Sequence, residues 1–166
     1  MLNPASITIA SLALAIAFSA SAAELGGKVV AVKDGDSIVV LDDAFAEHQI
    51  RLGGIDAPER SQPHGQAAKR SLSQMVFGQR VLVVWNTTDP YGRTVGKVLL
   101  QGEDVNLRQI EAGYAWHYRH YQSEQSPSDR TAYAQAEIDA RQAHLGLWQD
   151  AAPIPPWRYR RMHRHH

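Results

Sequence analysis

Cysteine is absent from this chain of 166 residues. Its absence excludes a disulfide framework, a thiol nucleophile and any zinc site built on cysteine. A folded domain of this composition must depend on its own hydrophobic core, and the chain is long enough for one domain with a substantial core.

A surplus of charge of either sign is also missing, because 17 Lys and Arg residues balance 17 Asp and Glu residues. No global positive field marks the chain as a polyanion binder, so any site for nucleic acid must be local. Of the eight histidines, three lie in the final four residues, and no HExxH-like pair occurs. Histidines in a tail are usually solvated, so no dedicated zinc site is predicted.

Extended apolar stretches are scarce, and the longest is Ile7–Phe18, which is followed by the small residues 19–23. The stretch is shorter than the ~20 residues that span a bilayer, although a membrane anchor or a core helix is the alternative. An apolar segment followed by small residues is typical of an export signal. We therefore expect residues 1–23 to be a signal peptide cleaved after Ala22 or Ala23. The mature protein would be periplasmic or secreted, with no membrane attachment.

Five short β-rich runs precede most of the predicted helices, an order that favours a small closed β-barrel flanked by helices. A doubly wound sheet would need regular alternation of strands and helices. The fold class is therefore α+β or mostly β. The predicted strands are 29–32, 37–41, 48–52, 80–85 and 95–100, and the predicted helices are 65–76, 104–113 and 127–144. Residues 24–150 form the predicted domain, and residues 151–166 form a Pro/Arg/His-rich tail with little core.

Two acidic segments each follow or join a predicted strand at one end of the barrel. Asp36 and Asp56 are candidate ligands of one Ca²⁺ ion, which prefers carboxylate and carbonyl oxygens, and the backbone oxygen of Ala57 can add a third. Glu59 can sit one water away from the ion. The alternative for each segment is an ordinary solvated turn.

Two arginines accompany these acids, Arg51 within a strand and Arg93 at the end of the turn Asp89–Arg93. Each is equally well a solvated surface residue when taken alone. Together they offer two rigid guanidiniums that can grip phosphate oxygens in pairs. A cation and a phosphate held against each other are what metal-assisted phosphodiester cleavage requires.

In chain order, Asp-Gly-Asp-Ser, a strand arginine, Asp-Ala-Pro-Glu, Asp-Pro-Tyr-Gly-Arg and Leu-Gly-Leu-Trp resemble the staphylococcal-nuclease-like (thermonuclease) family over Lys28–Trp148. The resemblance implies a five-stranded OB-fold barrel with three helices. It also implies a Ca²⁺-dependent endonuclease and exonuclease that cuts DNA and RNA and leaves 3′-phosphate ends. The implied metal-holding residues are Asp36, Asp56 and Ala57, and the implied catalytic residues are Arg51, Glu59 and Arg93.

Aromatic and basic residues alternate in Tyr114–Tyr121, and nucleobases stack on aromatic rings with little sequence preference. We expect Arg119, Tyr121 and Tyr91 to contact substrate, whereas Trp116 and Tyr118 fit a core position equally well. The family resemblance places a second substrate-stacking tyrosine at the position of Arg119. The expected partner is single-stranded DNA or RNA, bound by a monomer.

Two other functions fit parts of this pattern. A catalytically silent OB-fold module that binds single-stranded nucleic acid should have lost some of the acids and arginines, yet all are present. A calcium-stabilised adhesion domain explains the aspartates but leaves both arginines without a role. The complete set therefore favours a nuclease.

Overall fold

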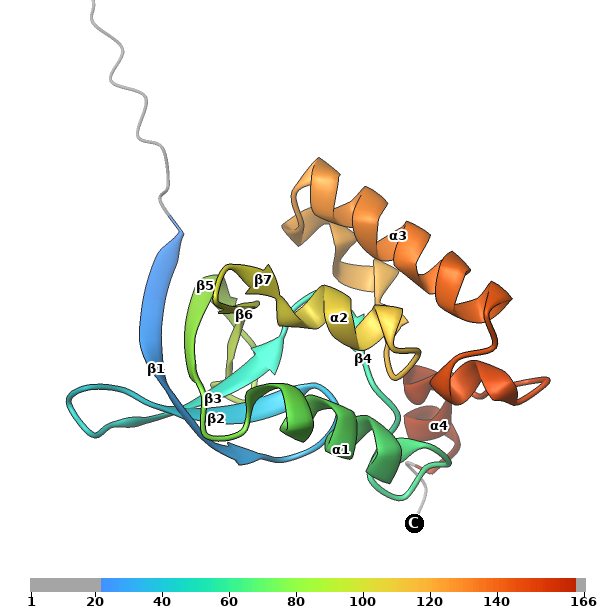
Figure 1. The fold of residues 1–166 in the computed structure, drawn as a ribbon, viewed down its shortest axis with the longest axis horizontal. Helices are drawn as coiled ribbons and strands as arrows, with labels where there is room; N and C mark the ends of the chain where they lie inside the picture. The colour runs from blue at the N-terminus through green and yellow to red at the C-terminus, as the bar shows by residue number, and fades with distance from the viewer. Residues whose placement is uncertain (1–21, 164–166) are drawn as a thin grey trace, which may run out of the picture.

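The computed structural model describes residues 22–163, so the predicted signal peptide lies outside the described residues except for its last two positions. Five strands form a closed barrel in the order β3-β2-β1-β5-β6, and β3 pairs in parallel with β6 to complete it (Figure 1). The prediction of a five-stranded OB-type barrel is confirmed. The barrel strands are β1 Ala23–Val32, β2 Ser37–Leu41, β3 Glu47–Leu52, β5 Arg80–Thr88 and β6 Thr94–Leu100.

Three further short strands lie at the edges of the barrel. β7 pairs with β6, while β4 and β8 form a separate two-stranded sheet. Their bounds are β4 Ile55–Asp56, β7 Glu103–Asp104 and β8 Trp116–His117. This small sheet fixes the backbone of Asp56, since Asp56 is paired with Trp116.

Strand β1 begins earlier than its sequence predicts. Residues 23–28 contain two glycines and carry little β propensity, yet they pair along β5 from Trp85 back to Arg80. Gly27 suits this position because a Cβ there would lie 2.5 Å from the carbonyl oxygen of Leu41 on β2. Pairing with a long neighbouring strand therefore outweighs the local preference.

Branched aliphatic side chains fill the barrel. Val29, Val40, Ile50, Val83 and Val98 have no exposed surface and come from all five strands. Burying one such side chain stabilises a fold by about 1.5–3 kcal/mol. The barrel interior therefore supplies the core that a chain without disulfides requires.

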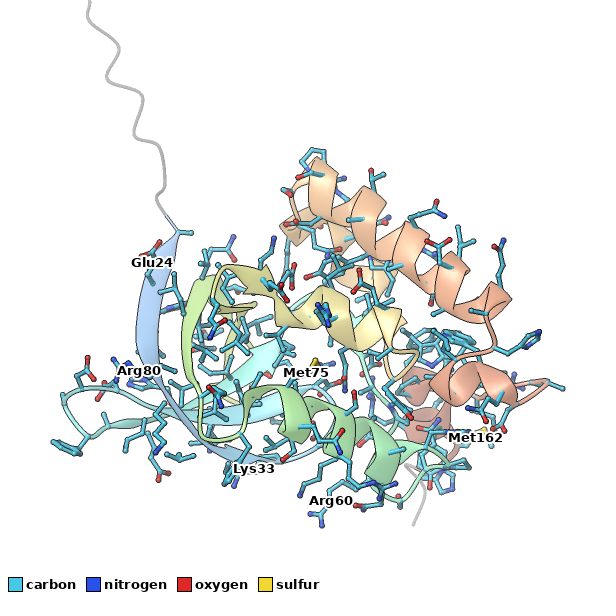
Figure 2. All side chains as sticks on the ribbon, in the orientation of Figure 1. Glu24, Lys33, Arg60, Met75, Arg80 and Met162 are labelled. Carbon is cyan, nitrogen blue, oxygen red and sulfur yellow. The ribbon has the colours of Figure 1, made fainter. Side chains whose placement is uncertain are left out.

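Of the four α-helices, α1 and α2 pack on the barrel, α2 lies between α1 and α3, and α4 lies to one side (Figure 1). Side chains, Met75 of α1 among them, fill the space between α1, α2 and the barrel (Figure 2). The helices are α1 Gly65–Val76, α2 Val105–Glu111, α3 Pro127–Gln142 and α4 Pro156–Met162, and two 3₁₀ helices are η1 Arg119–Glu124 and η2 Gly146–Gln149. No helix within residues 22–163 combines the length and apolar character needed to cross a membrane.

The apolar spacing and the capping residues that predict the helices have the same roles in the structure. In α1, Ala68, Leu72 and Val76 are fully buried at four-residue spacing, so one face of the helix meets the core. The Asp104 carboxylate accepts from the N–H of Leu107 at 3.0 Å and caps α2. Ser126 caps α3 in the same way.

The C-terminal tail contains a helix, α4, which adds a fourth helix to the three that the sequence predicts. Of its residues, Pro156 is buried, and Trp157 packs edge-on against Trp116 with ring centroids 5.6 Å apart. The Tyr159 hydroxyl lies 3.2 Å from the Ser61 hydroxyl. The tail adds little core, but it is attached to the domain along one side of α4.

Asn106 connects α2 to the barrel and is fully buried. Its Oδ1 accepts from the N–H of Val98 at 3.1 Å, and its Nδ2 donates to the carbonyl oxygens of Gly53 and Gly96 at 2.9 and 3.1 Å. Without the Asn106 side chain, the N–H of Val98 and the carbonyl oxygens of Gly53 and Gly96 would each lose a hydrogen-bond partner inside the protein. Asn106 therefore joins the helix layer to two strands at once.

We expect Asn106→Ala to lower the free energy of unfolding by about 2–4 kcal/mol, because buried backbone groups lose their partner. Urea unfolding monitored by circular dichroism measures the loss. Arg108→Ala is the control, since Arg108 is an exposed residue of the same helix, and it should change stability by less than ~0.5 kcal/mol. Equal stability of Asn106→Ala and the parent would contradict this account of the connection.

Candidate active site

Asp36 enters the site from the turn between β1 and β2. Its carboxylate accepts from the backbone N–H of Ala57 at 2.7 Å and from the Ser37 hydroxyl at 3.1 Å. Gly35 makes the approach possible, because a Cβ there would lie 2.6 Å from the Cβ atoms of both Ala57 and Ala68. The turn therefore packs directly on the loop that carries the second acidic segment.

Arg51 joins Asp36 to Asp56. It pairs with Ser37 across β2 and β3, and its Nη1 lies 2.7 Å from Asp36 Oδ2. Its Nη2 donates to Asp56 Oδ1 at 3.0 Å. The Arg51 side chain is 14% exposed, and Asp56 is 1% exposed. Arg51 is thus held between two buried carboxylates, and the alternative of a solvated surface cation is excluded.

Arg93 reaches the same place from the turn between β5 and β6. The Asp89 carboxylate holds the turn by accepting from the backbone N–H groups of Tyr91 and Arg93 at 2.9 and 3.0 Å. It also accepts from Arg93 Nε at 2.7 Å, which orients the guanidinium. Arg93 Nη1 lies 3.4 Å from the Ser37 hydroxyl oxygen, next to Asp36.

Glu59 follows Pro58, and its backbone N–H donates to Gln62 Oε1 at 3.2 Å. Its side chain is 37% exposed, in contrast to the buried Asp36 and Asp56. A partly exposed carboxylate beside buried ones is accessible to water, which a general base needs.

Arg160 of α4 also reaches this site, although sequence reasoning assigned it no role. Its guanidinium donates from Nη1 and Nη2 to the two oxygens of Asp56, at 3.1 and 2.8 Å, and from Nη1 to Glu59 Oε1 at 2.7 Å. Nothing in the local sequence indicates this contact, because Arg160 lies 104 residues after Asp56. Only the packing of α4 reveals it.

These side chains line one pocket of about 510 Å³. The predicted site residues on its wall are Asp36, Arg51, Asp56, Ala57, Glu59, Tyr91, Arg93 and Tyr121. Other residues of the wall that sequence reasoning did not assign to the site include Asp34, Tyr118, Glu124 and Arg160.

Arg119 is the predicted site residue that the structure places elsewhere. It donates to Glu137 Oε2 of α3 at 3.0 Å and does not line the pocket. Tyr118 lines the pocket instead, and its backbone N–H donates to the Gly54 carbonyl at 2.8 Å. The alternation of aromatic and basic residues identified the segment, but only the path of the backbone decides which side chains face the pocket.

Burial and charge together shift the protonation equilibria of the site. Burial, with the neighbouring Asp36 charge, raises the pKa of Asp34 from 3.8 to about 6. Burial also raises the pKa of Asp56, although Arg160 and Arg51 oppose the change. Burial disfavours the charged form of Arg51, but Asp36 and Asp56 outweigh it, so the pKa of Arg51 lies above its ordinary value.

The donor set suits a hard divalent cation. Five carboxylates, those of Asp34, Asp36, Asp56, Glu59 and Glu124, line the pocket together with the guanidiniums of Arg51 and Arg160, and a sixth, that of Asp89, is paired with Arg93. Negative charge is therefore in excess. Within residues 22–163, no group of three or more His, Asp or Glu side chains forms a metal site by itself. A cation bound by the aspartates would accordingly need a backbone oxygen and water, which calcium accepts readily.

Comparison with known proteins identifies the family. Residues 49–150 match the family model described as staphylococcal nuclease homologue. Protein ParB of Escherichia coli is 38% identical over 161 residues, which cover 92% of this chain and 88% of that protein. Micrococcal nuclease of Shigella flexneri is 37% identical over 148 residues, covering 84% and 82% of the two chains. Staphylococcal-like nuclease CAN1 of Arabidopsis thaliana is 39% identical over 113 residues, covering 68% of this chain and 33% of that protein.

The raised pKa of Asp34 predicts a pH-dependent stability. A carboxyl group with a raised pKa in the folded state stabilises the fold below pH ~4, and this stabilisation is lost as the pH rises through about 6. We expect Asp34→Asn in chelator to raise the free energy of unfolding at pH 7.5 by roughly 1–2 kcal/mol. Urea unfolding should show a smaller gain at pH 4.5. A gain that is independent of pH, or a loss at pH 7.5, would contradict the repulsion between Asp34 and Asp36.

Proposed function

Because the chain belongs to the staphylococcal nuclease family, we propose that it is an exported calcium-dependent nuclease that hydrolyses phosphodiester bonds of DNA and RNA and leaves 3′-phosphate ends. The family assignment confirms the resemblance carried by the sequence motifs. Relatives named as nucleases and endonucleases support a nuclease hydrolase. The motifs and the pocket chemistry support the choice of calcium, and the apolar stretch before residue 24 supports export.

One observation supports the proposal: carboxylates that could bind a cation or accept a proton lie in the same pocket as guanidiniums that could bind a phosphate. Asp36 and Asp56 offer buried oxygens, while Arg51 and Arg93 offer guanidiniums on two different barrel elements. Glu59 supplies the exposed carboxylate. A module that only binds nucleic acid has no need of this combination.

Calcium would be held by the Asp36 and Asp56 carboxylates and the backbone oxygen of Ala57, where it would neutralise charge on a non-bridging phosphate oxygen. The N–H of Ala57 donates to Asp36, so the backbone of Ala57 lies next to this carboxylate. A role for its carbonyl oxygen does not depend on its side chain. Ala57 is therefore compatible with such a role.

Arg51 and Arg93 would bind the phosphate and stabilise the charge that develops on it. Arg51 is oriented by two carboxylates and Arg93 by Asp89, so neither guanidinium has to be ordered when substrate arrives. Donors that are already oriented lower the barrier because no reorganisation accompanies the reaction.

Glu59 would orient the attacking water and accept its proton. Its partly exposed carboxylate meets solvent at the pocket, and its backbone is held by Gln62. Attack by water opposite the leaving 5′ oxygen places the phosphate on the 3′ side of the cut. The second proton of the water would stay on the new phosphate, and the leaving 5′ oxygen would take up a proton from solvent as Glu59 releases the one it accepted, which balances the hydrolysis.

Exposed tyrosines at the pocket favour an unpaired strand as substrate. Tyr91 is 85% exposed and Tyr121 is 50% exposed, and both line the pocket. Bases that are not paired can stack on such rings, each contributing ~1–3 kcal/mol. We therefore propose single-stranded nucleic acid as the preferred substrate, bound by a monomer.

Calcium should be required for cleavage of a single-stranded DNA oligonucleotide by the mature protein. We expect millimolar Ca²⁺ to support cleavage and a chelator to reduce it by about 10²-fold or more, with Mg²⁺ a poor substitute because it demands a stricter octahedral site. End-labelled products should resist polymerase extension until a phosphatase removes the 3′-phosphate. Full cleavage in chelator would remove the metal from the proposal, and binding without cleavage would identify a silent OB-fold module.

Glu59→Gln should slow single-turnover cleavage by roughly 10²-fold, because the amide cannot accept a proton. The variant should keep its fold and its calcium-dependent affinity for an oligonucleotide, since Glu59 lies in a loop outside the barrel. Glu111→Gln is the matched control, as Glu111 is an exposed acid of α2. A Glu59→Gln protein that cleaves at the parent rate would exclude Glu59 as the base.

A further inference from the structure

The C-terminal helix α4 is positioned independently of the contact that Arg160 makes with the pocket. Trp157 packs against Trp116 and Tyr118, with ring centroids 5.6 and 5.4 Å apart. Before the helix, the carbonyl oxygen of Ile154 accepts from Gln62 Nε2 at 2.5 Å. These contacts anchor α4 beside the loop that carries Glu59, so the Arg160 side chain starts from a stable base.

Arg160 uses the same carboxylate oxygens that a cation would need. Each of its terminal nitrogens donates to a different oxygen of Asp56, and Nη1 also donates to Glu59. Asp56 Oδ1 additionally accepts from Arg51. Three short N–H···O contacts on one carboxylate leave little lone-pair density for a metal ion.

We propose that Arg160 is a tethered cation that competes with the divalent ion for Asp56 and restrains Glu59, which makes α4 an autoinhibitory element of the active site. The inference rests on the proposed function in one respect, namely that the ion bound by Asp56 is calcium. Arg160 lies outside residues 49–150, the part of the chain that matches the family model, and it belongs to none of the sequence motifs described above.

Electrostatic repulsion makes Arg160 and a divalent ion competitors for Asp56. Asp56 is 1% exposed, so solvent screens its neighbours only weakly. Arg160 and a divalent ion placed on the same buried carboxylate would repel each other, and each would lower the affinity of the other. Thermodynamic linkage requires that removing the arginine tightens binding of the ion.

The restraint can be released without unfolding the helix. The Arg160 side chain is 36% exposed and borders the pocket of about 510 Å³, so its guanidinium can turn away from the carboxylates. Trp157 and Ile154 would keep α4 in place during that movement. Withdrawal of Arg160 frees Asp56 Oδ2 and the carboxylate of Glu59 together, while Asp56 Oδ1 keeps its contact with Arg51, so ion binding and release of the proposed base are coupled.

Calcium titration of Arg160→Gln and the parent protein by isothermal calorimetry tests the competition without any measurement of cleavage. We expect Arg160→Gln to lower the Kd for Ca²⁺ by roughly tenfold, within the range of ordinary coupling between two ligands. The melting temperature of Arg160→Gln should also rise further on addition of calcium. Arg160→Lys, which keeps the charge but loses the paired contact, should fall between the two.

Arg161→Gln is the matched control, because it removes the same charge from the exposed neighbouring position of α4. An unchanged or weaker affinity in Arg160→Gln would overturn the inference, as would an equal tightening in Arg161→Gln. If the parent cleaves DNA with calcium but Arg160→Gln binds the ion no more tightly, the inference fails and the proposed function stands. If Arg160→Gln tightens calcium binding while neither protein cleaves DNA, the competition stands and the nuclease proposal fails. Absence of calcium binding in both proteins would overturn both.

Discussion

Two aspartates buried side by side are the constraint on which the rest of the site depends. Asp36 and Asp56 are 6% and 1% exposed, and uncompensated carboxylates in such places are strongly destabilising. Arg51 forms ion pairs with both, and Arg160, from the C-terminal helix, forms a second ion pair with Asp56. Further acidic side chains leave negative charge in excess in this pocket, and that charge would attract the calcium ion that we propose for the site.

The barrel decides where these charges meet. Closure through the parallel pairing of β3 and β6 sets Arg51 opposite Val95, which brings the turn that carries Arg93 next to the same end of β3. An open sheet would leave these two arginines on separate edges. Asn106 then holds the closing strand β6 to α2, through its hydrogen bonds to Val98 and Gly96.

The regulation and the catalysis that we propose would both depend on Asp56. If Arg160 restrains this carboxylate in the way we propose, the C-terminal helix sets how much calcium is needed before the site opens. Such a device costs affinity for the ion but keeps the exposed Glu59 engaged until an ion is present. At low calcium concentration the enzyme would then stay restrained.

Alternating β-branched residues, the spacing of the α1 apolar face and the caps of α2 and α3 act locally, so the sequence by itself determined the barrel strands, three helices and the chain order of the acidic and arginine-containing motifs. Sequence patterns also identified eight of the residues that line the pocket. Seven of them lie in a predicted strand or in a loop next to one, and Tyr121 lies in the segment where aromatic and basic residues alternate. Only the tertiary structure decided that β1 begins at Ala23, that Tyr118 rather than Arg119 lines the pocket, and that Arg160 contacts Asp56. Those outcomes depend on pairing and packing between segments far apart in the chain, and neither periodicity nor propensity contains that information.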